Sequence, residues 1–305
     1  EKTHDIVPIE TCELENKKAD KILISIKSLM KKYRILPYDE DKRKGIIRHV
    51  LIRTSFHYDE IMVVLVTNVD VFPGRNDFIK ELKKLNPEIT TVIQNINSRD
   101  TNVILGEKQR ILFGKGYIND ELCSIKFKIS PKSFYQVNPL QTEKLYSLAI
   151  EKANISKNDL VLDAYCGIGT IGLIASKYAR EVVGVEIVKE AVIDAVNNAK
   201  NNNIENAKFY VGDAGEFIIN EYNQGVRYDV VIMDPPRKGS SEEFLSILIK
   251  TKPSRIVYVS CDPATLARDL KYLSSTYDIV SVNPVDMFPH TFHVENVVLL
   301  SLKNN

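Results

Sequence analysis

A regular alternation of short apolar runs and amphipathic stretches, which begins near Leu160, constrains the fold more than any other feature of the chain. The apolar runs have the length and β-branched content of buried strands, and the stretches between them have helical periodicity. Because parallel strands must be joined by crossover helices, this alternation predicts a doubly wound α/β domain. Strands are expected at 160–166, 182–187, 208–211, 229–233 and 255–261, and helices at 170–178, 189–202, 214–222, 241–250 and 264–274.

The last part of the chain departs from this rhythm. Two apolar runs, 279–282 and 294–302, are separated only by a proline-containing turn, which is too short for a crossover helix. We therefore expect them to form an antiparallel hairpin at the sheet edge, which makes the sheet mixed and seven-stranded.

The first half of the chain is less regular and predicts a smaller α+β domain over residues 1–129. Segment 130–138 is interpreted as its link to the second domain, 130–305. Helices are expected at 19–33 and 77–85, and strands at 46–54, 61–67, 91–96, 109–114 and 124–129.

Composition bounds the class of protein. The 305 residues carry 41 Lys and Arg against 40 Asp and Glu, so net charge alone does not indicate nucleic-acid binding. No apolar run is long enough to predict a transmembrane helix, and the first residues lack the profile of a signal peptide. The four cysteines have no framework spacing, which is typical of reduced thiols in a cytoplasmic protein.

A glycine-rich segment follows the first strand of the expected α/β domain. Gly167, Gly169 and Gly172 permit a tight turn, close approach of the backbone to a ligand, and close packing of the next helix. This pattern alone would also suit a dinucleotide. Carboxylates end the next two strands: Glu186 could accept hydrogen bonds from both ribose hydroxyls, and Asp213 could reach an adenine amino group.

Two further carboxylates favour S-adenosylmethionine over NAD. Asp163 ends the first strand, near the expected place of the methionine ammonium, which a dinucleotide lacks. Asp234 begins an Asp-Pro-Pro-Arg run after the fourth strand, a rigid polar segment beside the expected sulfonium, although such a run can also be a simple turn. Ligands of α/β sheets bind at the carboxyl ends of the strands. The sequence therefore predicts an S-adenosylmethionine site there.

Cys261 ends the fifth strand, directly before a helix begins. The helix N-terminus is expected to lower the pKa of this thiol, whereas the alternative interpretation is a buried structural cysteine. A thiolate suits uracil chemistry, because its addition to C6 makes C5 enolate-like and able to attack a methyl donor. A base must then remove the C5 proton so that elimination frees the enzyme.

Glu295, at the mouth of the terminal hairpin, is the candidate base, because burial there would raise the pKa of its carboxyl group. The alternative is a surface carboxylate on an edge strand. His290 and His293 lie nearby, but their spacing in a loop is weak support for a metal site, and no metal is expected.

Five motifs together resemble the RNA uracil-C5 methyltransferases, a family that includes bacterial 23S ribosomal RNA and transfer RNA enzymes. They are FYQVN at 134–138, DAYCGIG at 163–169, DPPRKG at 234–239, SCDP at 260–263 and HVEN at 293–296. The resemblance implies an α/β, Rossmann-like S-adenosylmethionine-dependent methyltransferase domain beside the smaller α+β domain.

The resemblance also implies roles for single residues. Cys261 becomes the nucleophile and Glu295 the proton-abstracting base. The implied cofactor-binding residues are Gln136, Tyr165, Gly167, Gly169, Glu186, Asp213 and Asp234.

Arg237 separates this family from its enzymatic rivals. Cytosine-C5 RNA methyltransferases are similar to one another in having a second cysteine after the strand-four prolines, and amino-directed methyltransferases have an aromatic residue there. Arg237 is instead expected to contact the substrate. An RNA-binding protein that kept only the cofactor fold would lack the pair of Cys261 and Glu295.

The chain also departs from the family pattern. Many members begin with a small β-barrel RNA-binding domain, which this sequence lacks, so the chain is interpreted as a fragment. Cys12 resembles the last of four cluster-binding cysteines of the ribosomal enzymes, but no cysteine precedes it, so no iron–sulfur cluster is expected. Cys12 favours ribosomal over transfer RNA as the partner. We expect a monomer whose first domain and Arg237 region contact the RNA backbone.

Overall fold

The computed structural model describes residues 9, 11–12, 15–100 and 102–304. The chain divides into two compact units, residues 1–120 with 129–132 and residues 121–128 with 133–305, so the division is not a single cut near residue 130. Residues 121–128 belong to the second unit. There, the backbone N–H groups of Lys126 and Lys128 donate to the side chains of Asn202 and Asn198, at 2.9 and 2.8 Å.

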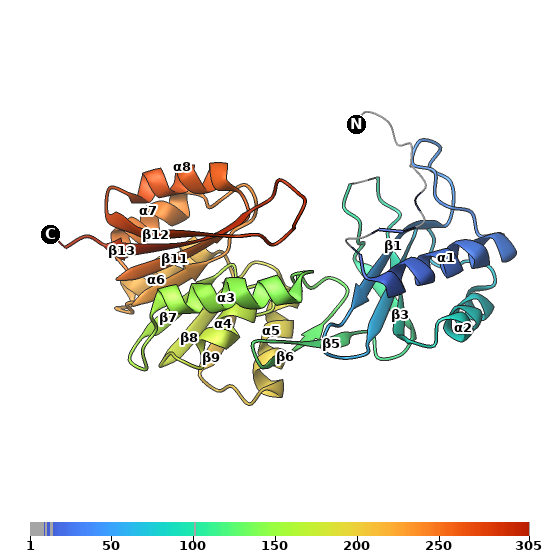
Figure 1. Cartoon of the computed structure of the whole chain (residues 1–305), viewed down its shortest axis with the longest axis horizontal. Helices are drawn as coiled ribbons and strands as arrows, with labels where there is room; N and C mark the ends of the chain where they lie inside the picture. Colours follow the sequence, from blue (N-terminus) through green and yellow to red (C-terminus); the bar gives the residue numbers. More distant parts are fainter. Residues whose placement is uncertain (1–8, 10, 13–14, 101, 305) are drawn as a thin grey trace. The chain divides into compact units, whose positions relative to one another are not determined.

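The first unit is a four-stranded sheet with two helices packed on it (Figure 1). β2 and β3 are parallel and are connected through α2, whereas β1 and β4 pair antiparallel at the two edges. Every residue of β2 is buried, as expected for a central strand. The elements are α1 (Lys17–Lys32), β1 (Ile47–Thr54), β2 (Ile61–Thr67), α2 (Arg75–Leu85), β3 (Ile89–Ile96) and β4 (Lys108–Phe113).

Helix α1 shows why this part of the chain folds as it does. Asn16 caps the helix by accepting a hydrogen bond from the backbone N–H of Lys18 at 2.9 Å. Its apolar residues recur every three or four positions, so that one face packs into the core of the unit. The buried residues of this face are Ala19, Ile22, Ile26 and Leu29.

The second unit is built on a seven-stranded sheet with the strand order β12-β13-β11-β10-β7-β8-β9. β7 to β11 are parallel, and β12 and β13 form an antiparallel hairpin in which β13 pairs with β11. The predicted mixed sheet is confirmed. Its strands are β7 (Leu160–Ala164), β8 (Glu181–Glu186), β9 (Ala207–Val211), β10 (Val230–Met233), β11 (Arg255–Ser260), β12 (Tyr277–Val285) and β13 (Glu295–Leu302).

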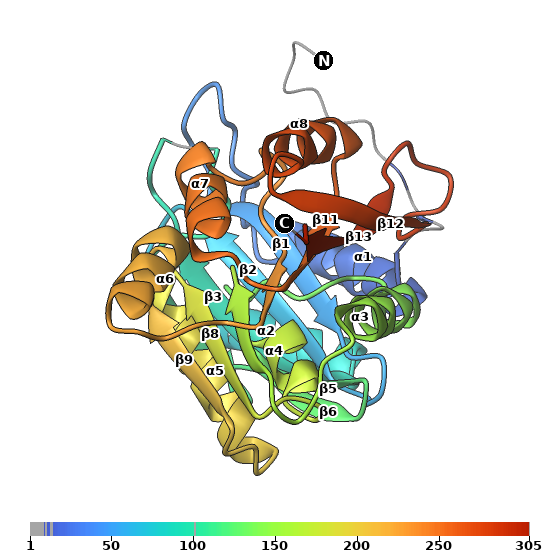
Figure 2. The same cartoon turned by 90° about the vertical axis from the view of Figure 1, so that its left-hand side faces the viewer.

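Helices cover both faces of this sheet (Figure 2). One face carries α3 (Pro139–Ala153), α4 (Thr170–Ala175) and α5 (Lys189–Asn201), and the other carries α6 (Ala214–Asn223), α7 (Glu242–Thr251) and α8 (Pro263–Leu273). Apolar residues of α6, α7 and α8 form one buried core with the strands beneath them. Within the described residues, no helix has the length and apolar character needed to cross a bilayer.

Two elements were not expected from the sequence. Helix α3 begins directly after Asn138, which caps it, so a helix follows the segment interpreted as a link. Strand β5 (Ile118–Leu122) pairs with β6 (Ile125–Ile129). Cys123 and Ser124 connect them, both with positive φ, as a two-residue hairpin turn of type I′ requires.

The strand register brings several strand ends to one edge of the seven-stranded sheet. Met233, the last residue of β10, pairs with Ala164 of β7 and with Tyr258 of β11. Ser260, the last residue of β11, pairs with Asn296, the second residue of β13. The residues that follow β7, β10 and β11 therefore share this edge with the start of β13.

Candidate active site

The turn between β7 and α4 contains two glycines with different surroundings. Gly167 and Gly169 have φ values of +55° and +82°, in the region that favours glycine. A Cβ atom on Gly167 would meet no atom within 4 Å, whereas one on Gly169 would lie 2.8 Å from the ring of Phe209. Gly167 therefore leaves room for a ligand, and Gly169 lets the turn pack against β9.

Glu186 lies at the end of β8, beside this turn. Its Oε2 atom accepts a hydrogen bond from the backbone N–H of Gly167 at 3.1 Å, and its Oε1 atom accepts one from Val188 at 2.9 Å. Each carboxylate oxygen has a second lone pair, so acceptor capacity remains for a ligand. The structure thus brings together two of the predicted cofactor residues.

Asp213 has a structural role at the start of α6. It is the N-cap of α6, and its Oδ1 atom accepts hydrogen bonds from the backbone N–H groups of Gly215 and Glu216 at 2.8 and 3.1 Å. This cap accounts for the position of Asp213 at the end of β9. Its contact with a cofactor stays a prediction.

Asp163 points into the fold. The residue is 1% exposed, and its Oδ2 atom accepts a hydrogen bond from the backbone N–H of Gly172 at 2.8 Å. Burial, with the charge of Glu186 as a smaller cause, raises the pKa of this carboxyl group to about 7. Asp163 therefore ties α4 to β7 from beneath the glycine turn.

Tyr146 of α3 lies beside two of the predicted site residues, Gln136 and Asp234, and was not predicted from the sequence. It is 3% exposed, and burial followed by the charge of Asp234 raises the pKa of its hydroxyl group. Hydrogen bonds with Thr170 and Gln136 oppose this rise. Gln136 therefore lies close to Tyr146 and, through it, to the end of β10. The Asn138 cap followed by proline at the first helical position is the sequence signal that could have revealed α3 and with it Tyr146.

Two carboxyl groups with raised pKa values lie after the end of β10 and at the start of β13. Burial raises the pKa of Asp234 to about 8, and the charges of Glu295 and Asp163 add to the rise. Glu295 is 5% exposed, and burial raises its pKa while Arg237 opposes the change. The expectation that burial raises the pKa of Glu295 is confirmed.

Cys261 follows β11 directly and is partly exposed. Burial raises the pKa of its thiol, the charges of Glu295 and Asp234 raise it further, and Arg237 acts in the opposite direction. The pKa of Cys261 was expected to be lowered at this helix start but is raised overall, although a backbone hydrogen bond opposes the rise. Electrostatically, Cys261 belongs to one group with Glu295, Asp234 and Arg237.

The cap of α8 helps to explain this outcome. Asp262 accepts hydrogen bonds from the backbone N–H groups of Ala264 and Thr265 at 2.9 and 3.0 Å. These donors at the helix start are thus occupied by a carboxylate, and the two nearby acidic groups disfavour a second negative charge on sulfur.

Tyr165 lies between the glycine turn and α7. Its φ is +64°, its hydroxyl group is 3.0 Å from the Oγ atom of Ser240, and its ring packs edge-on against Phe244. These contacts fix the ring in a half-buried position. Tyr165 therefore has a defined place beside the predicted cofactor residues.

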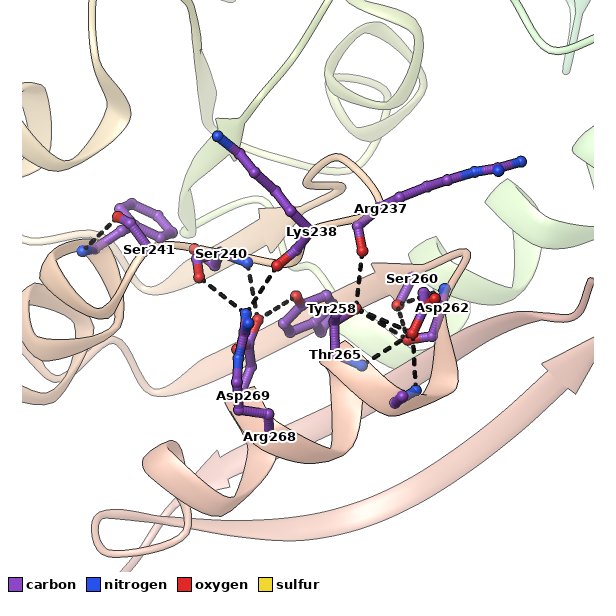
Figure 3. Close-up of polar contacts among 12 residues, drawn as sticks. Arg237, Lys238, Ser240, Ser241, Tyr258, Ser260, Asp262, Thr265, Arg268 and Asp269 are labelled. Carbon is purple, nitrogen blue, oxygen red and sulfur yellow. Dashed lines mark hydrogen bonds and ion pairs between the residues drawn. The ribbon is translucent and has the colours of Figure 1, made fainter. Parts of the chain in front are cut away.

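Arg237 is exposed in the loop that follows β10. Its carbonyl oxygen accepts a hydrogen bond from the Oγ1 atom of Thr265 at 3.1 Å, while its side chain extends away from this contact (Figure 3). The guanidinium group is close enough to lower the pKa of both Cys261 and Glu295. It can therefore reach a group that binds beside them.

Cys12, which resembles one ligand of the family's iron–sulfur cluster, lies far from these residues in sequence. Cys12 is a free, partly exposed thiol, and several of its neighbours are outside the described residues. Among the residues that the structure describes, no group of three or more His, Cys, Asp or Glu side chains is arranged to bind a metal ion.

Comparisons with known proteins decide the family. The tRNA (uracil-5-)-methyltransferase family matches residues 76–303. An uncharacterized RNA methyltransferase of Halalkalibacterium halodurans is 47% identical over the whole chain, which covers 67% of that protein. One of Staphylococcus aureus is 44% identical over 99% of this chain, again covering 67% of the relative. The chain belongs to the RNA uracil-C5 methyltransferase family.

A solved structure supports the same assignment. The Pyrococcus abyssi tRNA (uracil-54, C5)-methyltransferase in complex with S-adenosyl-L-homocysteine is 30% identical, with a TM-score of 0.82 over 98% of this chain and 71% of that one. A Methanocaldococcus jannaschii tRNA m1G37 methyltransferase has a TM-score of 0.52 at 16% identity over 97% of this chain and 81% of that one, which shows the fold alone. The predicted methyltransferase fold and the predicted RNA uracil-C5 methyltransferase are confirmed.

Proposed function

We propose that this S-adenosylmethionine-dependent enzyme methylates C5 of a uridine in 23S ribosomal RNA through a covalent bond between Cys261 and uracil C6. The observation that carries the proposal is the shared edge of β10, β11 and β13, where the charge of Glu295 raises the pKa of Asp234 and both carboxylates raise the pKa of Cys261. The uridine must be flipped out of its helix, because C6 cannot be reached within a stack.

Cys261 forms the covalent bond. Its thiolate adds to C6, and the electron pair of the C5–C6 double bond moves to C5, which becomes the nucleophile toward the methyl group. S-adenosylmethionine supplies that methyl group. Burial and two carboxylates raise the pKa of Cys261 and so disfavour the thiolate. The positive charge of Arg237 lowers this pKa and therefore favours formation of the thiolate.

Glu295 completes the cycle. It takes the proton from C5, the electrons of that C–H bond restore the C5–C6 double bond, and the C6–S bond breaks to return the thiolate of Cys261. A raised pKa strengthens the carboxylate as a proton acceptor near neutral pH.

The residues around the glycine turn fit the cofactor. The open space at Gly167 is what close approach of a ligand to the backbone requires, and the oriented carboxylate of Glu186 suits ribose hydroxyl groups. Gln136, Tyr165 and Asp234 are the further residues that we propose to hold it. Gly169 contributes through packing of the turn rather than through contact.

The choice of ribosomal RNA rests on the residues around Cys12, which resemble the ribosomal branch of the family. Transfer RNA is the second candidate, because the Pyrococcus abyssi relative is a tRNA (uracil-54, C5)-methyltransferase. A monomeric state and a cytoplasmic location stay predictions from the sequence.

Trapping with 5-fluorouridine tests both the reaction and the substrate. Fluorine at C5 cannot be removed as a proton, so the adduct with Cys261 should persist in denaturing gels. We expect adducts with fluorinated 23S fragments in the presence of S-adenosylmethionine, their loss in Cys261→Ala, and their retention in the control Cys123→Ala. Adducts with transfer RNA alone would overturn the choice of substrate, and no adduct with any RNA would overturn the mechanism.

A further inference from the structure

The loop of residues 235–241, which follows β10, is fastened to α8 by three side chains that the mechanism does not use (Figure 3). This loop starts next to Asp234 and carries Arg237, so its position sets where both side chains lie. α8 begins just after Cys261. These contacts therefore connect the helix that begins just after Cys261 with the loop that carries Arg237, the proposed substrate contact.

Asp269 is the centre of this fastening. The residue is 1% exposed, and its Oδ2 atom accepts hydrogen bonds from the backbone N–H of Ser240 at 2.8 Å and from the hydroxyl group of Tyr258 at 2.7 Å. Its Oδ1 atom accepts from the Nε atom of Arg268 at 2.8 Å. A buried carboxylate with this many donors is held firmly, because hydrogen bonds to a charged acceptor are the strong ones.

Arg268 and Thr265 extend the contact along the loop. The Nη2 atom of Arg268 donates to the carbonyl oxygen of Lys238 at 2.9 Å, and the Oγ1 atom of Thr265 donates to that of Arg237 at 3.1 Å. Gly239 lies between them with φ of +76°, and a Cβ atom there would be 2.7 Å from Oδ2 of Asp269. The loop backbone thus approaches α8 as closely as a glycine permits.

Ser240 carries the connection on to the cofactor side. Its backbone N–H is bound by Asp269, and its Oγ atom is 3.0 Å from the hydroxyl group of Tyr165. Asp269 therefore acts on two groups at once: on Arg237 through the loop, and on Tyr165 through Ser240.

We propose that Asp269 is a positioning residue for methyl transfer, which fixes Tyr165 and Arg237 relative to Cys261 by holding the 235–241 loop against α8. The proposal rests on the function proposed above, because it assigns Asp269 to the same site. Asp269 is buried, and in this proposal it acts through backbone groups of the loop rather than by contact with the cofactor or the uracil. Misplacement of reacting groups by about 1 Å can cost roughly a hundredfold in rate, so an indirect role can be large.

The test compares Asp269→Asn with a matched control, Asp159→Asn. Asp159 is also buried, accepts from the backbone N–H of Ser156 at 2.8 Å, and pairs with Arg255 at 2.9 Å. It precedes β7, at the opposite end of the strand from the site. Both substitutions replace a carboxylate by an amide of the same shape, so both should lower the thermal midpoint.

Only Asp269→Asn should slow adduct formation with 5-fluorouridine RNA, by about tenfold or more, and weaken S-adenosylhomocysteine binding measured by calorimetry. Thr265→Val, which removes one contact with the loop and leaves Asp269 intact, should slow adduct formation less. If Asp269→Asn does not fold, Thr265→Val is the variant that tests the positioning role.

Equal adduct rates and equal ligand affinities in wild type and both variants would overturn the positioning role. Equal losses in Asp269→Asn and Asp159→Asn would assign Asp269 to stability alone. If wild type itself forms no adduct with any RNA, the proposed function fails, which is a separate and distinguishable outcome.

Discussion

Burial and nearby carboxylates raise the pKa of Cys261, although the residue stands at the start of a helix. Burial, Glu295 and Asp234 all raise the pKa of the thiol, whereas Arg237 and a backbone hydrogen bond lower it. The sequence located Cys261 at a strand end but predicted the opposite shift, because a single sequence does not show which carboxylates lie across the sheet. Glu295 follows Cys261 by many residues and approaches it only through the antiparallel pairing of β13 with β11.

Glu295→Gln should separate addition of the thiolate from its release. The substitution removes a negative charge that raises the pKa of Cys261, so the thiolate forms at lower pH and the rising limb of adduct formation moves to lower pH. Turnover should fall by about a hundredfold to ten-thousandfold, because the base is lost. Single-turnover rates of adduct formation from neutral to alkaline pH measure the first effect.

Arg237→Ala is the opposing control for this experiment. Because Arg237 lowers the pKa of Cys261, its loss should move the same limb to higher pH. Identical profiles for wild type and both variants would contradict the electrostatic coupling.

At the scale of elements, the sequence predicted the strands that are buried on both faces of the sheet. The parallel strands of the second unit are nearly continuous apolar runs, which a sequence shows directly. β5 was missed because its residues are mostly polar. Asp120 in β5 is nevertheless 1% exposed, since it accepts hydrogen bonds from Ser55 and from the backbone N–H groups of Phe56 and His57. Tertiary contacts of this kind are not visible in a local pattern.

Helix α3 was missed for a related reason. Its buried face includes Thr142 and Tyr146, whose polar groups dilute the apolar period that identifies a helix. The Asn138 cap followed by proline at the first helical position was a usable signal. Missing this helix also affected the prediction of the site, because Tyr146 and its contact with Gln136 could not be predicted.

The turn between β7 and α4 allows stability and ligand binding to be tested separately. Gly169→Ala places a Cβ atom 2.8 Å from Phe209 at positive φ, and it should destabilise the fold by about 1–3 kcal/mol. Gly167→Ala meets no protein atom, so it should cost only about 1–2 kcal/mol for its backbone conformation while it fills the space that we propose for the cofactor. Denaturant unfolding and S-adenosylhomocysteine titration provide the two readouts.

The different surroundings of Gly167 and Gly169 predict opposite rankings of the two variants in ligand affinity and in stability. Gly167→Ala should lose more ligand affinity than Gly169→Ala, although Gly169→Ala loses more stability. If Gly167→Ala bound S-adenosylhomocysteine as tightly as wild type, the open space at this position would not belong to the cofactor.

At the scale of the whole molecule, charge is balanced overall, so RNA binding depends on which cations lack a partner. Several basic residues of the first unit are engaged: Lys32 pairs with Glu81 at 2.6 Å, and Lys42 pairs with Asp39 at 2.8 Å. In the part of the chain that the structure describes, Arg237 and Lys238 form no ion pair. These two cations beside the active site can therefore contact RNA phosphates, although the net charge of the chain is only +1.

Salt dependence of RNA affinity tests this distribution of charge. Each cation that neutralises a phosphate releases counterions, so affinity should fall as salt rises, and Arg237→Ala should reduce the logarithmic slope by about one if Arg237 contacts a phosphate. Lys42→Ala is the control, because Asp39 already neutralises Lys42 and its removal should change the slope little. Fluorescence anisotropy over a salt series with one uridine-containing 23S fragment measures the affinity of wild type and of both variants.

An affinity that does not respond to salt would contradict phosphate contacts altogether. Equal slopes for the two variants would show that the unpaired cations beside Cys261 contribute no more to RNA binding than paired ones elsewhere.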